Sequence, residues 1–161
     1  MATTNLSKYD KSKVPSATKM KFAIVVAEWN SEITENLCKG AINTLITSGC
    51  SKKNIERYNV PGSFELIYAA NILVKKKKYS AVIVLGSVIQ GETKHFDFVC
   101  SGVTNGIAHL NATQNTPVIF GLLTDDNIEQ AKARSGGGLG NKGVECAVTA
   151  IKMAELKINI K

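Results

Sequence analysis

The chain has 161 residues, enough for one domain with a full hydrophobic core and too few for two comfortable domains. Hydrophobic residues make up 44% and charged residues 20%, a composition that indicates neither a disordered chain nor a membrane protein. The net charge of +7 is weak evidence for nucleic-acid binding, because residues 1–21 alone hold five lysines against Asp10.

The predicted elements begin after a polar N-terminal stretch. Residues 1–19 lack hydrophobic periodicity, so we expect a flexible N-terminal arm followed by a single domain over residues 20–161. Short apolar runs predict strands at 21–27, 54–60, 80–89 and 116–123. Apolar residues at helical spacing predict a helix after each strand: one through Ile33 to Leu45 that ends by Gly49, one that begins at Ser63 and carries Phe64 to Ala70, one bearing Phe96 to Ile107, and two at about 126–133 and 143–157.

The alternation of strands and helices predicts the fold class. Strands separated by helices of this length pair in parallel through right-handed crossovers, which places helices on both faces of the sheet. Nearly continuous apolar strands agree, because both faces of such a sheet are covered. We therefore expect an α/β fold, a flavodoxin-like three-layer sandwich whose four-stranded parallel sheet is flanked by helices.

Polar and aromatic residues follow each predicted strand. The segments are Glu28–Asn30, Pro61–Glu65, Gly91–His95 and Leu123–Asp126. The carboxyl ends of parallel strands meet at one edge of the sheet, where ligands bind in open α/β folds. The sequence therefore predicts a small-molecule site at this edge.

Three features at this edge allow two interpretations each. Gly91 to Thr93 open a helix whose N-terminus suits a phosphate, or they form a turn with Thr93 as the N-cap. His95, in the first turn of that helix, is either a general base or a structural hydrogen-bonding residue. Trp29, the only tryptophan, either stacks on a planar heterocycle or packs in the core.

Three other features of the sequence argue against a dinucleotide-binding loop, a metal site, and a secretory leader or membrane span. Gly138 to Gly143 match G-x-G-x-x-G but follow a helix rather than a strand, so we interpret Ser135–Gly143 as a flexible connection. The four cysteines have no metal-ligand spacing and are expected to be reduced and mostly buried. Without a charged and apolar leader or a spanning segment, a cytoplasmic protein is expected.

Six segments in order, from about residue 20 to 156, resemble one known family. They are "VVAEWNSEIT", "VPGSFEL", "LGSVIQGETKHFDFV", "PVIFGLLT", "IEQAKAR" and "GNKGVECAVTAIKMA", and together they resemble the 6,7-dimethyl-8-ribityllumazine synthases. The resemblance implies a transferase of riboflavin biosynthesis that condenses 5-amino-6-(D-ribitylamino)uracil with 3,4-dihydroxy-2-butanone 4-phosphate. It implies no metal and no organic cofactor.

The resemblance also implies roles for particular residues. It makes His95 the proton-transfer residue and Glu92, Thr93 and Arg134 the phosphate-binding residues. It implies that the pyrimidine and ribityl groups are bound by Trp29, Ser63, Phe64, Glu65, Ser87, Val88, Ile89, Phe120 and Lys142. In the family, the counterparts of Phe120 and Arg134 reach the site from an adjacent subunit, so a homopentamer, or a 60-subunit shell of twelve pentamers, is expected. Riboflavin synthase is a candidate partner; nucleic acid and membrane are not.

Two residues depart from the family pattern. Gln90 stands where many members carry a basic residue, and Glu28 where arginine is common. A flavin- or lumazine-binding module without catalysis is the main alternative function. The presence of His95, Thr93 and Arg134 favours catalysis, because a protein that only stacks a ligand does not require them.

Overall fold

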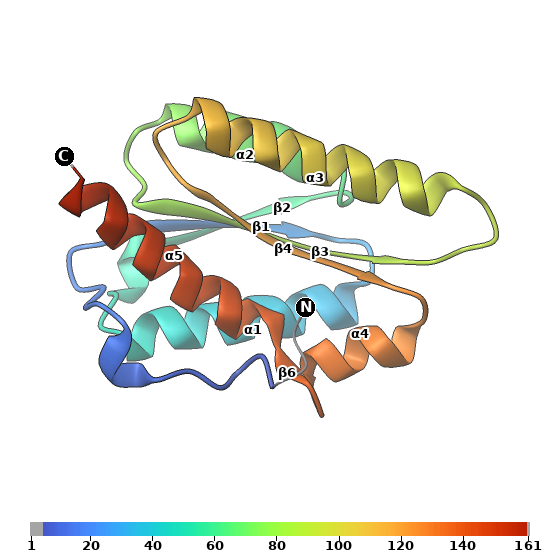
Figure 1. Cartoon of the computed structure of the whole chain (residues 1–161), viewed down its shortest axis with the longest axis horizontal. Helices are drawn as coiled ribbons and strands as arrows, with labels where there is room; N and C mark the ends of the chain where they lie inside the picture. The colour runs from blue at the N-terminus through green and yellow to red at the C-terminus, as the bar shows by residue number, and fades with distance from the viewer. Residues whose placement is uncertain (1–4, 161) are drawn as a thin grey trace.

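The computed structural model describes residues 5–160, in which helices and strands alternate (Figure 1). In chain order the elements are η1 (Lys11–Lys13), β1 (Phe22–Ala27), α1 (Ser31–Thr47), η2 (Lys52–Asn54), β2 (Ile55–Val60), α2 (Leu66–Lys75), β3 (Ala81–Ile89), α3 (His95–Thr113), β4 (Val118–Asp125), α4 (Ile128–Arg134), β5 (Ser135–Gly137), β6 (Gly140–Asn141) and α5 (Lys142–Asn159). None of the helices between residues 5 and 160 combines the length and apolarity needed to cross a bilayer.

The main sheet confirms the predicted fold class. Its order is β2-β1-β3-β4, and every neighbouring pair is parallel. In Figure 1, α2 and α3 lie on one face of the sheet, and α1, α4 and α5 lie on the other. The result is the expected three-layer α/β sandwich, in which all four strands point their carboxyl ends toward one edge.

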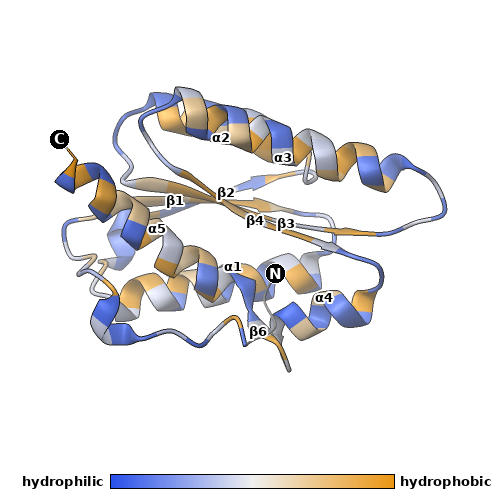
Figure 2. Ribbon diagram, viewed as in Figure 1, coloured by the Kyte–Doolittle hydropathy of each residue, from blue (hydrophilic) through white to orange (hydrophobic). Residues whose placement is uncertain are grey.

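The layers are held together by two hydrophobic clusters, one on each face of the sheet. Phe22, Ile24 and Val26 of β1 pack toward α1 and α5, whereas Ala23 and Val25 pack toward α2 and α3. Because side chains alternate along a strand, a strand buried on both sides must be apolar throughout. Figure 2 shows this contrast between the apolar inner strands and the helices, which carry both apolar and polar residues.

Two local predictions differ from the structure. Helix α2 begins at Leu66, three residues later than Ser63, because Ser63 and Phe64 belong to the loop after β2. The connection after α4 is not irregular: β5 and β6 form a short antiparallel pair. Gly136 and Gly140 have positive φ angles of 127° and 83°, which permit the tight hairpin that only glycine adopts readily.

The described part of the N-terminal segment runs along the face formed by α1 and α5. Leu6 N–H donates to Leu139 O at 2.8 Å, and Ala17 N–H donates to Ser48 O at 2.9 Å. Ala17 is fully buried in the cluster beneath α1. Residues 1–4 of the predicted arm lie outside the described residues.

A polar network holds the start of β2, at the end of the sheet opposite the four loops. Glu56 pairs with Lys21 at 2.7 Å and Lys78 at 2.8 Å, and accepts hydrogen bonds from the Tyr58 and Tyr79 hydroxyls. Hydrogen bonds from Lys21, then Lys78 and the tyrosines, hold the pKa of Glu56 far below its usual value. Burial and the Glu56 bond raise the pKa of Tyr79 to about 12.

Candidate active site

The loops after the four strands are joined by main-chain hydrogen bonds. Glu28 N–H donates to Val60 O at 2.9 Å, which connects the ends of β1 and β2. Gln90 N–H donates to Asp125 O at 2.9 Å, which connects the ends of β3 and β4. The carboxyl edge of the sheet is therefore a defined platform, as expected for a ligand site in this fold class.

A pocket of about 770 Å³ opens on this platform. Its volume falls within the range of about 300–1,000 Å³ that is typical of small-molecule sites. The ends of β1 and β3, the loop before α2 and the first turn of α3 form its walls. It is lined by Trp29, Asn30, Gly62, Ser63, Phe64, Glu65, Ser87, Val88, Ile89, His95, Phe98 and Val99.

Asn30 sets the course of the chain beside Trp29. Its backbone is left-handed, with φ 56° and ψ 47°, a conformation that asparagine tolerates better than most residues. Its Nδ2 donates to Ser87 O at 2.9 Å and so connects the loop after β1 to β3. Trp29 is 73% exposed, so its indole does not pack in the core of the chain and lines the pocket instead.

The pocket is lined by both polar and aromatic side chains. Phe64 is about half exposed, which leaves ring surface available to a ligand. Ser63 and Ser87 are buried, and Ser87 Oγ has no hydrogen-bond partner within the described part of the chain. A buried hydroxyl without a partner is unfavourable by about 1–3 kcal/mol, so a polar ligand atom at this position would gain by bonding to it.

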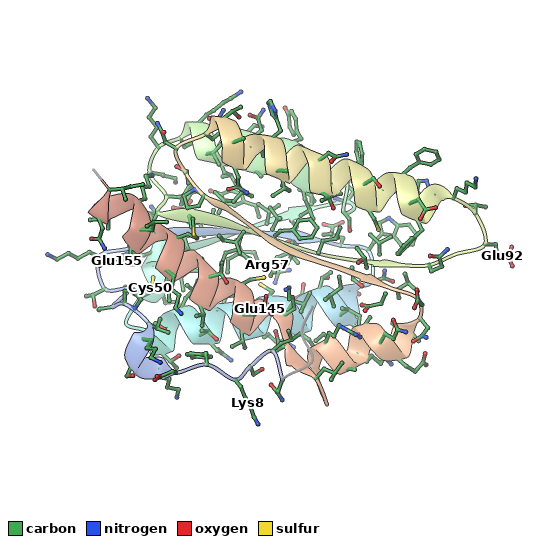
Figure 3. The ribbon with its side chains drawn as sticks, in the orientation of Figure 1. Lys8, Cys50, Arg57, Glu92, Glu145 and Glu155 are labelled. Carbon is green, nitrogen blue, oxygen red and sulfur yellow. The ribbon has the colours of Figure 1, made fainter. Side chains whose placement is uncertain are left out.

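His95 is the first residue of α3 and lines the same pocket. The N-cap of α3 is Lys94 rather than Thr93, although the Oγ1 of Thr93 accepts a hydrogen bond from His95 N–H at 3.4 Å. Glu92 and Thr93 are exposed and do not line the pocket. Figure 3 shows Glu92 at the tip of the β3–α3 loop, directed away from the body of the protein.

Phe120, Arg134 and Lys142 also lie away from this pocket within one chain. Phe120 lies on β4 beside the start of α5, in a second hollow that Cys146 also lines. Arg134, the last residue of α4, donates from Nη1 to Gln130 O at 3.0 Å. Lys142 pairs with Glu145 in the first turn of α5.

Arg134 also contacts a buried carboxylate at the end of β4. Its Nη1 lies 3.4 Å from Asp125 Oδ1, and Asp125 is 4% exposed. Burial raises the pKa of Asp125, and the charge of Arg134 opposes this shift. The Asp125 contact and the bond to Gln130 O thus hold the guanidinium near the carboxyl edge of β4.

Four residues that line the pocket had no predicted binding role: Phe98 and Val99, and also Asn30 and Gly62, which lie in the segments predicted to form this edge. Phe98 and Val99 lie three and four positions after His95, so they share its face of α3. This helical spacing was a signal available in the sequence. Gly62 and Asn30 are adjacent to predicted site residues, and their place in the wall follows from the loop conformations.

Fold and pocket together define an α/β protein with a pocket of small-molecule size, lined by aromatic and polar side chains, at the carboxyl edge of its sheet. The family model described as 6,7-dimethyl-8-ribityllumazine synthase matches residues 19–158. The chain therefore belongs to the 6,7-dimethyl-8-ribityllumazine synthase family, as the resemblance of its signature segments implied.

Curated relatives support this membership over nearly the whole chain. The 6,7-dimethyl-8-ribityllumazine synthase of Christiangramia forsetii is 56% identical over 158 residues, covering 98% of this chain and 94% of the relative. Those of Phocaeicola vulgatus and Porphyromonas gingivalis are 54% and 52% identical over 153 residues. These two alignments cover 95% of this chain, and 91% and 95% of the respective relatives.

Proposed function

We propose that the pocket at the carboxyl edge is where this chain forms 6,7-dimethyl-8-ribityllumazine. Family membership makes the chain an enzyme of riboflavin biosynthesis, acting at the penultimate step. The substrates are 5-amino-6-(D-ribitylamino)uracil and 3,4-dihydroxy-2-butanone 4-phosphate, and the other products are phosphate and water. The observation that supports this location is that eight of the thirteen expected site residues line one pocket: Trp29, Ser63, Phe64, Glu65, Ser87, Val88, Ile89 and His95.

The residues of the pocket suit the chemical demands of this reaction. An amine of the pyrimidine forms an imine with the ketone and releases water. Loss of the neighbouring C–H proton then expels phosphate and leaves an enol, which becomes a new ketone; the second amine attacks this ketone and closes the ring with release of another water. Each step requires that the reactants be oriented and that protons be moved, rather than a strongly activated nucleophile. Trp29 stacks on the pyrimidine, the segments at Ser63 and Ser87 bind its polar atoms and the ribityl chain, and His95 transfers protons.

We further propose that the working enzyme is a homopentamer with sites between subunits. Phe120, Arg134 and Lys142 do not line the pocket of their own chain, which supports their supply by a neighbouring chain, as the family resemblance implies for Phe120 and Arg134. Exposed aromatic residues around the α2–α3 layer, among them Tyr68 and Phe98, provide apolar surface for such contacts. Arg134, with Glu92 and Thr93, binds the substrate phosphate.

The proposed assembly makes predictions about size and location. Five chains of 17.3 kDa give a particle of about 87 kDa, and twelve pentamers give a shell of about 1 MDa. We propose a cytoplasmic enzyme with one domain over residues 20–161 and an N-terminal arm over residues 1–19, of which residues 5–19 pack along α1 and α5. Association with riboflavin synthase belongs to the same proposal. Native mass measurement distinguishes the two sizes, and a monomer would contradict the shared site.

The activity is tested by mixing the purified protein with both substrates and following the absorbance of the lumazine product. Folded protein that binds the pyrimidine but gives no product would be a binding module rather than an enzyme. Arg134→Ala should raise the KM for the phosphorylated ketone more than the KM for the pyrimidine. An equal effect on both would contradict the phosphate role of Arg134.

A further inference from the structure

Arg134 and Lys142 flank the hairpin formed by β5 and β6. Arg134 immediately precedes β5, and Lys142 immediately follows β6. In the antiparallel pair, Ser135 lies opposite Asn141, so the residues next to both cations face each other across the ladder. The relative placement of the two cations therefore depends on how this hairpin is held.

The amide side chain of Asn141 holds the β5–β6 hairpin in place. The Oδ1 of Asn141 accepts hydrogen bonds from Gly143 N–H at 2.8 Å and Val144 N–H at 3.4 Å, which caps the start of α5. Its Nδ2 donates to Ser135 O at 3.2 Å and to Asn36 O of α1 at 2.9 Å. A single side chain thus connects the end of α4, the start of α5 and the second turn of α1.

The surrounding backbone leaves room for this side chain. A Cβ on Gly40 of α1 would lie 2.5 Å from Asn141 Oδ1, too close to be tolerated without movement. A Cβ on Gly143 would lie 1.9 Å from Leu37 O, so α5 begins in contact with the α1 backbone. Glycine is a poor helix former, and its use inside α1 is explained by the space that Asn141 occupies. Figure 1 shows β6 and the start of α5 gathered with α1 and α4 near the N-terminal segment.

Helix capping alone does not explain the choice of asparagine. Serine, threonine and aspartate also accept hydrogen bonds at an N-cap. Only the amide adds two N–H donors beside its acceptor oxygen, and both of its bonds to carbonyl oxygens use this Nδ2 group. The Nδ2 group donates to Ser135, the residue directly after Arg134. The Oδ1 atom caps the first turn of α5, which begins at Lys142.

We propose that Asn141 is a positioning residue that sets Arg134 at the correct place relative to the start of α5, and so tunes affinity for the phosphate group of the substrate. The inference rests on the proposed function, in which Arg134 binds that phosphate. A displacement of about 1 Å in a binding group is enough to lower catalytic efficiency by up to roughly 100-fold. Without the Nδ2 group, Ser135 O and Asn36 O lose the hydrogen bonds that they accept from Asn141.

The test separates the two halves of the side chain. Asn141→Asp keeps the acceptor that caps α5 and removes both donors, so it should raise the KM for the phosphorylated ketone about tenfold or more. The KM for the pyrimidine should change much less, and inorganic phosphate should inhibit more weakly. Asn141→Ser, which also keeps only the cap, should give the same pattern.

Asn127→Asp is the matched control. Asn127 caps α4, the helix that ends in Arg134, through Oδ1 and Gln130 N–H at 2.9 Å, and no Nδ2 bond is present among residues 5–160. This variant makes the same chemical change without removing a donor bond, so both KM values should stay near wild type. Circular dichroism, melting temperature and native mass verify the fold of each variant.

Several results would overturn the inference. These are equal KM changes for both substrates in the Asn141 variants, an equally large selective effect in Asn127→Asp, or loss of folding in both Asn141 variants. The last would assign Asn141 a purely structural role. A wild-type protein that forms no lumazine contradicts the proposed function instead, and weaker binding of inorganic phosphate by Asn141→Asp would still report the positioning effect.

Discussion

Replacing Trp29 separates the role of a ligand-binding aromatic residue from that of a core residue. Trp29 is 73% exposed, so folding removes from water only roughly 70 of its ~250 Å². At about 25 cal/mol per Å², Trp29→Ala should lower the free energy of unfolding by no more than about 1.7 kcal/mol. Stacking of a base on an aromatic ring contributes about 1–3 kcal/mol, so the KM for the pyrimidine should rise about 5- to 150-fold.

The assay combines kinetics, fluorescence and stability. Steady-state rates with each substrate varied in turn give the two KM values for wild type, Trp29→Ala and Trp29→Phe. Trp29→Phe keeps an aromatic face and should show a smaller increase than Trp29→Ala. Because Trp29 is the only tryptophan, quenching of wild-type emission by the pyrimidine reports binding directly. An unchanged pyrimidine KM in Trp29→Ala, or an equal rise for the phosphorylated ketone, would refute the stacking role.

Three further predictions concern stability and reactivity. Gly143→Ala places a Cβ against an α1 carbonyl oxygen, so urea unfolding should show a loss of about 1–3 kcal/mol. Gly138→Ala, whose Cβ meets nothing within 4 Å, should change stability by no more than about 0.5 kcal/mol. The pKa of Glu56 is depressed by Lys21 and other partners, so its contribution is present above pH ~4.5 and is lost as pH falls through the lower folded-state pKa. Urea unfolding of Glu56→Gln should therefore depend less on pH below about 4.5 than wild type, and parallel curves would exclude the network. Burial raises the pKa of Cys146 to about 12, so a thiol reagent should label it only after denaturant is added; fast labelling of native protein would contradict this burial.

Much of the fold could be predicted because hydrophobic periodicity is a local property of the chain. The apolar run from Ala81 to Ile89 is buried over most of its length, as a central strand covered on both faces requires. The order β2-β1-β3-β4 was not predicted, because it depends on which strands pair. The start of α2 was also misplaced, because Ser63 is drawn into the loop that borders the pocket.

Part of the candidate site could likewise be predicted from the sequence, and part could not. Trp29 and His95 were placed at one edge by the rule that parallel strands share a direction, and both line the pocket. Whether Trp29 was a core residue could not be decided from its neighbours in sequence, because exposure depends on what packs around the loop. The hydrogen bond from Asn30 to Ser87 O could not be predicted, because the two residues are 57 positions apart in the sequence.

The sequence by itself determined the alternation of strands and helices, the edge at which the loops gather and the segments that mark the family, because each is a local pattern of residue types. Tertiary structure decided which expected residues share a pocket within one chain and which, such as Arg134, lie elsewhere. It also showed that Asn141 connects three helices. Such contacts join residues distant in sequence, and their distances follow from packing of the whole chain rather than from spacing along it.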